Sequence, residues 1–171
     1  ERTARMLLGE RFSIGKKPLW PGAEEVFNGM GGVKAFRNPE AFPRVWPVHE
    51  LRSISSEKQI VPELVKPLDE LRRRAFILGD APKLESCDGD DVRIVERGLN
   101  RAAISAKMAC RGMVIQADTW FPGWEARIDG KPAQIHEVYG FIRGIVVEAG
   151  DHRIEMRFRP ASVMVGASLT V

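Results

Sequence analysis

The sequence predicts a mainly β protein: an antiparallel, jelly-roll-like β-sandwich with a short helical segment in its N-terminal half. From residue 91 onward, apolar and polar residues alternate with a period of two, which is typical of strands that bury one face. Tight turns separate these runs, and Asp129-Gly130 is the strongest hairpin signal. The 171 residues include 16 glycines and 11 prolines, a content that favours a turn-rich β protein over a helical bundle.

The first half of the chain predicts shorter and less regular elements. Strands are expected over 11–14 and 33–36, and Pro47 confines the extended segment around it to a sheet edge or a bulge. Pro62 and Pro67 interrupt the helical region that begins near residue 56. The second of two short helices is expected to be formed by residues 68–78, because four apolar residues recur there at helical spacing: Leu68, Leu71, Ala75 and Leu78.

The change to a period-two pattern near residue 91 predicts how the chain is organised into domains. Residues 1–90 are expected to form an α+β segment that packs on a β-sandwich of residues 91–171, the two making one cooperative unit. The uncharged segment 161–171 is interpreted either as a final edge strand or as the start of a truncated membrane helix. The strand runs are expected near 92–94, 104–110, 113–120, 124–128, 134–138, 141–148 and 152–158.

Charge and motif content exclude several function classes. The net charge of +3 is spread along the chain, whereas a nucleic-acid-binding protein gathers its basic residues on one face. The segment Gly29–Lys34 lacks the spacing and the Ser/Thr of a phosphate-binding loop, and 88–91 (DGDD) lacks the ligand spacing of a calcium loop. We therefore expect no nucleic-acid partner, no cofactor and no catalytic residue in this chain.

The two cysteines, Cys87 and Cys110, have neither CxxC spacing nor a neighbouring histidine cluster, so no metal site is expected. A disulfide between them stays open at this stage. Spacing along the chain does not give the Cα separation, and the bond also needs an oxidising compartment.

One segment carries a family resemblance. Residues 118–131 read DTWFPGWEARIDGK and are followed by FIRG at 141–144, AGDH at 149–152 and FRP at 158–160. This pattern resembles the C-terminal extracytoplasmic domain of YfhO-type bacterial membrane proteins, which are multi-span proteins of the GT-C glycosyltransferase type. The resemblance covers residues 91–171 and extends more weakly to RNP at 37–39 and FPR at 42–44.

The resemblance implies a place and a role. It implies that the chain lies at the extracytoplasmic face of the bacterial cytoplasmic membrane, periplasmic or extracellular, as part of a protein that glycosylates cell-envelope polymers. The catalytic acidic residue of GT-C enzymes lies in an early loop outside this chain, so the fragment itself is expected to be non-catalytic. The implied partners are the parent membrane domain and a glycan or polyprenyl-phosphate-linked sugar.

The same motif supplies the candidate site. Pro122-Gly123 turns the chain sharply, and Trp120 and Trp124 are placed either to clamp that corner or to form a platform for a sugar ring. The expected function is therefore to position substrate or to stabilise the membrane part. The alternatives are a free-standing carbohydrate-binding module and a purely structural or assembly domain.

Charged residues complete the candidate site. Asp129-Gly130 closes the hairpin that follows the corner. Asp118 lies among apolar residues and needs cationic donors, for which Arg143 and Arg44 are the candidates.

Overall fold

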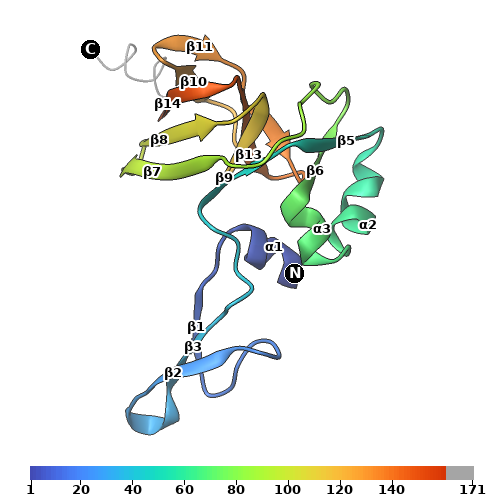
Figure 1. Cartoon of the computed structure of the whole chain (residues 1–171). Helices are drawn as coiled ribbons and strands as arrows, with labels where there is room; N and C mark the ends of the chain where they lie inside the picture. Colours follow the sequence, from blue (N-terminus) through green and yellow to red (C-terminus); the bar gives the residue numbers. More distant parts are fainter. Residues whose placement is uncertain (161–171) are drawn as a thin grey trace, which may run out of the picture. The chain divides into compact units, whose positions relative to one another are not determined.

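Two units make up the chain in a computed structural model that describes residues 1–160 (Figure 1). Internal contacts divide the chain into Glu1–Arg44 and Val45–Val171. The expectation of a membrane helix or edge strand at 161–171 lies outside the described residues. Within the described part, none of the helices has the length and apolar character that crossing a membrane requires.

The first unit joins a short helix to a small sheet. Met6 and Leu7 of helix α1 (Arg2–Leu7) are buried, and so are Phe36 and Phe42 of the same unit. Asn38 is buried as well, and its side-chain oxygen accepts a hydrogen bond from the backbone N–H of Glu40. The antiparallel sheet has the order β1-β3-β2, with β1 Phe12–Gly15, β2 Glu24–Asn28 and β3 Lys34–Arg37, and the 3₁₀ turn η1 is Met30–Gly32.

The second unit contains two sheets. The five-stranded sheet has the order β11-β10-β14-β8-β7, and the six-stranded sheet has the order β4-β9-β13-β12-β6-β5. All pairings described in these sheets are antiparallel except β5 with β6. The strands are β4 Val45–Val48, β5 Glu50–Ile54, β6 Arg74–Leu78, β7 Asp91–Arg97, β8 Arg101–Met108, β9 Gly112–Thr119, β10 Trp124–Ile128, β11 Lys131–Ala133, β12 His136–Val138, β13 Ile142–Val147 and β14 Gly150–Phe158.

The main core lies between the two sheets. The five-stranded sheet contributes Ile104 and Met108 from β8 with Ile154 and Met156 from β14, and the six-stranded sheet contributes residues from β4, β9 and β13. Along β14, buried and exposed residues alternate as the period of two predicts. The mainly β, sandwich-like fold expected from the sequence is confirmed.

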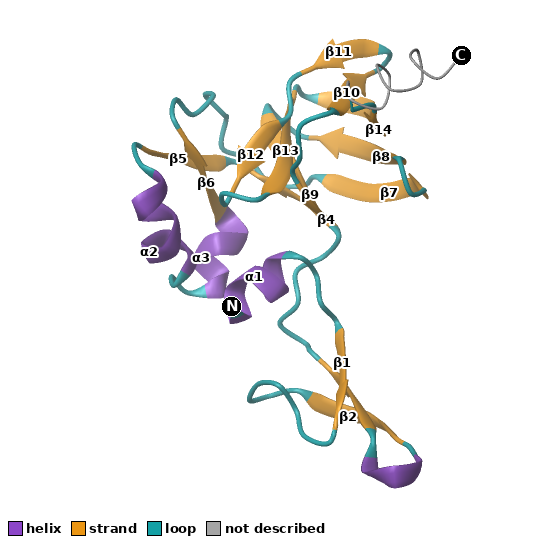
Figure 2. Ribbon diagram, turned by 180° about the vertical axis from the view of Figure 1, so that it is seen from behind, coloured by secondary structure: helices purple, strands orange, loops and turns teal. Residues whose placement is uncertain are grey.

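The short helical segment is also confirmed, but the predicted helix over 68–78 is wrong in its second half. The helical elements are η2 Glu57–Gln59, α2 Ile60–Leu64 and α3 Leu68–Arg73, and α2 and α3 lie beside β5 and β6 (Figure 2). After Arg73 the chain becomes β6, which pairs in parallel with β5. Ala75, Phe76 and Ile77 are all buried, and three consecutive buried residues suit a strand covered on both faces better than one stripe of a helix.

The six-stranded sheet combines distant parts of the sequence. Strands β4, β5 and β6 come from residues 45–78, whereas β9, β12 and β13 come from residues 112–147. The change of sequence pattern near residue 90 thus falls between β6 and β7, inside the second unit. Residues on both sides of it share one sheet.

Candidate functional site

The corner between β9 and β10 is built on backbone hydrogen bonds and one required glycine. The N–H of Trp120 donates to the carbonyl oxygen of Phe141 at 2.8 Å, and the N–H of Arg159 donates to the carbonyl oxygen of Gly123 at 2.7 Å. Gly123 has φ +106°, and a Cβ there would lie 2.9 Å from the Cα of Pro160. Only glycine fits this turn without strain.

Asp118 and Arg143 form an ion pair beside this corner. The Nη2 atom of Arg143 lies 3.2 Å from Oδ2 of Asp118, and the same oxygen accepts a hydrogen bond from Nε2 of Gln116 at 2.6 Å. Arg97 approaches the other carboxylate oxygen at 3.4 Å. Arg143 is only 2% exposed while Asp118 is 23% exposed, so a buried guanidinium is paired with a carboxylate that reaches water.

Trp124 is held by the same arginine. The Cζ atom of Arg143 lies 3.8 Å from the centroid of the indole ring, a close cation–π contact. The ring of Phe158 also contacts the indole, with centroids 5.3 Å apart, and Phe121 follows at 6.3 Å from Phe158. Because the Arg143 guanidinium covers one face of the Trp124 indole, that face is not open for stacking on a sugar ring.

A cleft of about 610 Å³ opens beside the ion pair. Its charged residues are three arginines and one aspartate, so the cleft favours ligands with a negative or strongly polar group. The Oε1 atom of Gln116 is buried and has no hydrogen-bond partner among the described residues. The lining consists of Arg97, Gly98, Leu99, Arg101, Ala102, Gln116, Asp118, Thr119, Trp124 and Arg143.

The structure thus brings Asp118, Trp124 and Arg143 together in one cleft, as three of the residues selected from the sequence. Trp120 and Gly123 shape the corner rather than the lining, and Pro122 is exposed on it. Arg44 belongs to the first unit, where its Nη1 donates to the carbonyl oxygen of Leu8 at 2.9 Å.

Asp129 and Gly130 form the hairpin turn between β10 and β11, both with positive φ. Asp129 accepts the backbone N–H of Arg153 at 2.8 Å, and its other carboxylate oxygen lies 2.7 Å from Nδ1 of His152. The backbone hydrogen bond from Arg153 is the main cause that lowers the pKa of Asp129, and the Asp129 carboxylate raises the pKa of His152. This pair is outside the cleft lining and fixes the turn.

Sequence reasoning missed Gln116, Arg97 and Arg101. One signal for Gln116 was present, because it is the single polar residue in the otherwise apolar run 113–117 of β9. The two arginines lie on either side of the turn between β7 and β8, far from the motif in sequence. Only strand pairing shows that they border the same cleft.

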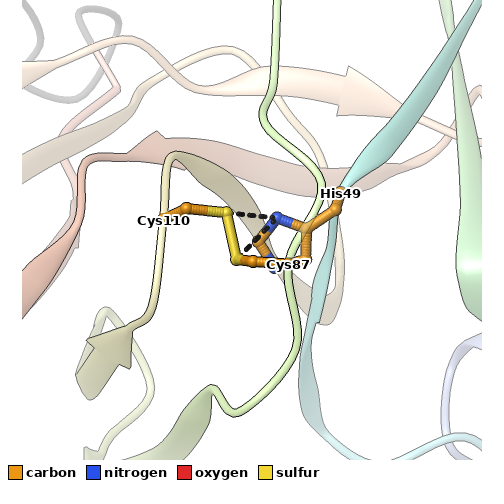
Figure 3. Close-up of side chains that lie close together, drawn as sticks. All are labelled: His49, Cys87 and Cys110. Atoms are coloured by element: carbon orange, nitrogen blue, oxygen red, sulfur yellow. Dashed lines mark hydrogen bonds between the residues drawn. A yellow bond between two sulfur atoms is a disulfide. The ribbon is translucent and has the colours of Figure 1, made fainter.

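A second cluster joins the cysteines to a histidine. Cys87 and Cys110 form a disulfide with a Cα–Cα distance of 6.2 Å, and the imidazole of His49 lies against the two sulfurs (Figure 3). Among the described residues, these three form the one group of His, Cys, Asp and Glu side chains whose ligand atoms lie close enough to hold a metal ion, all within 4.8 Å of one another. His49 comes from the junction of β4 and β5, and no spacing in the sequence links it to the cysteines.

The chain matches no protein-family model, no curated protein and no solved structure.

Proposed function

We propose that this chain is a non-catalytic, extracytoplasmic β-sandwich module of a YfhO-type, multi-span glycosyltransferase-like membrane protein. In this proposal the cleft beside Asp118 holds the sugar of a glycan or of a polyprenyl-phosphate-linked donor and positions it for the parent protein. The observation that carries the proposal is the combination of groups that line the cleft: a carboxylate and guanidinium groups beside an indole.

These groups match the chemistry of a sugar. Hydroxyl groups donate and accept hydrogen bonds; the carboxylate of Asp118 is an acceptor, whereas the guanidinium of Arg97 is a donor. The excess of arginine over aspartate suits an acidic sugar or the phosphate that joins a sugar to its carrier.

The extracytoplasmic place has one physical support besides the sequence resemblance. The Cys87–Cys110 disulfide is the form that persists in oxidising compartments and is rare in the reducing cytosol. The membrane parent and its glycosyl transfer rest on the motifs at 118–131 and 158–160. In this proposal the parent protein catalyses glycosyl transfer, and this chain binds and orients the sugar.

Ligand titration with a cleft variant tests the proposal. Neutral oligosaccharides, acidic oligosaccharides and a short-chain polyprenyl-phosphate sugar are each titrated into the ¹⁵N-labelled chain, and amide shifts are followed by NMR. We expect saturable shifts at β9 and the β7–β8 turn. Arg97→Ala should weaken binding without unfolding the chain, since Arg97 is 56% exposed. Arg93→Ala, also on β7 but outside the cleft lining, is the matched control.

A purely structural module is the second candidate, and one observation favours it. The buried Arg143 already has an ion pair with Asp118 and an aromatic partner in Trp124, so the corner is satisfied without a ligand. This alternative predicts no saturable shift with any of the three sugars. That result, with Arg97→Ala and Arg93→Ala indistinguishable, would reject the ligand-positioning function.

A further inference from the structure

His49 is positioned against the disulfide by two hydrogen-bond partners. Its Nδ1 atom lies 2.8 Å from the carbonyl oxygen of Glu85, and its Nε2 atom lies 2.5 Å from Oδ2 of Asp90. The side chains of His49 and Asp90 are 14% and 4% exposed, so this pairing is largely buried. Nδ1 lies 3.6 Å from the sulfur of Cys110 and 3.9 Å from that of Cys87.

These distances are those of a tetrahedral metal site. With zinc–nitrogen bonds of about 2.05 Å and zinc–sulfur bonds of about 2.3 Å, tetrahedral geometry separates a nitrogen from a sulfur ligand by about 3.5 Å, and two sulfurs by about 3.8 Å. The nitrogen atom of His49 is therefore already at ligand distance from both sulfurs. The two sulfurs, which are bonded to each other here, would have to separate, and Nδ1 would have to give up its hydrogen bond to the Glu85 carbonyl oxygen.

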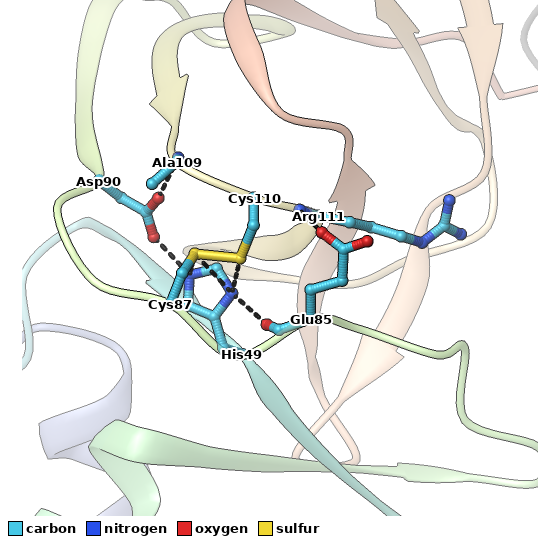
Figure 4. The surroundings of a disulfide bond; sticks show 7 residues. All are labelled: His49, Glu85, Cys87, Asp90, Ala109, Cys110 and Arg111. Atoms are coloured by element: carbon cyan, nitrogen blue, oxygen red, sulfur yellow. Dashed lines mark hydrogen bonds and ion pairs between the residues drawn. A yellow bond between two sulfur atoms is a disulfide. The ribbon is translucent and has the colours of Figure 1, made fainter.

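The segments that carry the two cysteines are held together without the disulfide (Figure 4). The N–H of Glu85 donates to the carbonyl oxygen of Arg111 at 2.9 Å, and the N–H of Arg111 donates to the Glu85 carboxylate at 3.1 Å. On the other side, the N–H of Ala109 donates to Oδ1 of Asp90 at 2.8 Å. These bonds flank Cys87 and Cys110, so both thiols would stay beside His49 after reduction.

Asp90 lies where a carboxylate orients the histidine ligand in known metal sites. A histidine that binds a metal through one ring nitrogen commonly donates its other N–H to a carboxylate, which fixes the tautomer and the ring orientation. Here Nε2 lies against Asp90, and Nδ1 lies against the Glu85 carbonyl oxygen and 3.6 Å from the sulfur of Cys110. The sulfur of Cys87 is about equally far from the two ring nitrogens, 3.9 Å from Nδ1 and 3.8 Å from Nε2. Gly112 leaves room for the ring, because a Cβ there would lie 2.7 Å from Cε1 of His49.

We propose that Cys87, Cys110 and Nδ1 of His49 form a redox-gated site for a zinc-type divalent cation, which is open when the cysteines are reduced and closed by the disulfide. A dithiol reduces the bond: the dithiol becomes a disulfide, and its two electrons and two protons pass to Cys87 and Cys110 as thiols. Binding of the cation releases to solvent both thiol protons and the proton that Nδ1 donates to the Glu85 carbonyl oxygen. Nδ1 exchanges its hydrogen bond to Glu85 for the metal, and that carbonyl or a water molecule completes the coordination.

The site has a route to solvent. A pocket of about 340 Å³ is lined by His49 and Cys87 together with Asp90, so a cation and a small dithiol can reach the sulfur. Thiolate, imidazole and a buried carboxylate partner form a donor set that selects zinc-like ions over magnesium or calcium. The proposal is independent of the sugar cleft and of the parent protein.

Cobalt titration of the oxidised and reduced chain tests the proposal. The 171-residue chain is reduced with a dithiol, freed of it by anaerobic gel filtration, and titrated with Co²⁺; Zn²⁺ then displaces the cobalt. We expect one Co²⁺ per reduced chain, with the visible bands of tetrahedral cobalt and a thiolate charge-transfer band, and no such spectrum for the oxidised chain. This comparison needs no substitution, so it does not depend on a variant's folding.

Variants then assign the ligands. Asp90→Asn should weaken Co²⁺ binding by about 10–100-fold, the range found when a carboxylate that orients a histidine ligand is replaced. His49→Gln should weaken it further, because it removes a ligand, and His136→Gln in β12 is the matched control with unchanged binding. Far-UV circular dichroism of the reduced chain monitors the fold. The proposal is overturned if the reduced chain binds no Co²⁺, if the oxidised chain binds it equally, or if His49→Gln binds like the wild type.

Discussion

Replacing Asp118 with alanine should destabilise the second unit strongly, because it leaves the Arg143 guanidinium without its carboxylate at 2% exposure. Removing one partner of a buried ion pair typically lowers the free energy of unfolding by about 3–5 kcal/mol. Two features place the expected value at the lower end, about 3 kcal/mol: Asp118 itself reaches water, and Arg143 keeps its contact with Trp124. Gln116 also loses the acceptor of its amide group.

Urea unfolding followed by circular dichroism measures this change in the free energy of unfolding. Thermal unfolding gives a second measure: for a unit of this size, each kcal/mol lost lowers the melting temperature by about 3–4 °C, so we expect a fall of about 10 °C. A double variant, Asp118→Ala with Arg143→Met, is the control: it removes the stranded charge and should recover most of the lost stability. A loss below about 1 kcal/mol for Asp118→Ala, the range of an exposed pair, would refute the reasoning that this ion pair holds the corner.

Three further predictions concern other parts of the second unit. The free energy of unfolding should fall as the pH rises above 6.5, because Asp129 raises the pKa of His152 in the folded state and folding then favours the protonated ring. Urea titrations at several pH values should show that His152→Gln removes most of this dependence on pH. His136 does not interfere above pH 6.5, because burial lowers its pKa and its effect on the free energy of unfolding therefore falls below that pH. Reducing the disulfide without added metal should lower the free energy of unfolding by about 3 kcal/mol, the loop-closure value for a 23-residue separation, and a change near zero would contradict this. Gly123→Ala should lower the melting temperature more than Gly130→Ala does: both positions have positive φ, but only at Gly123 would the new Cβ meet a backbone carbon at 2.9 Å.

Local pattern predicted the strands well and the long-range arrangement only in part. Alternation over 152–158 and the Asp129-Gly130 turn correspond to β14 and to the β10–β11 hairpin, since both depend on neighbouring residues. The helix predicted over 68–78 failed after Arg73, because leucine and alanine spacing fits a helical stripe as well as it fits a strand buried on both faces. Parallel pairing with β5, which decided the outcome, leaves no mark in the local sequence.

The candidate site shows the same limit. Asp118 indicated its need for a cation, and Arg143, one of the two arginines considered, forms an ion pair with it. The disulfide could not be decided, because 23 residues separate two cysteines that lie 6.2 Å apart at Cα. Pairing across strands supplies this information, and it appears only once the sheets are assembled.

The place of β14 in its sheet has a consequence for folding during synthesis. It is the central strand of the five-stranded sheet, between β10 and β8, yet it follows every other described strand in the chain. Until residues 150–158 have left the ribosome, that sheet can exist only as two separate hairpins, β7–β8 and β10–β11, which are at best marginally stable alone. The apolar residues of β8 and β10 lack their β14 neighbours until then, so the core of this sheet depends on β14, the last strand among residues 1–160.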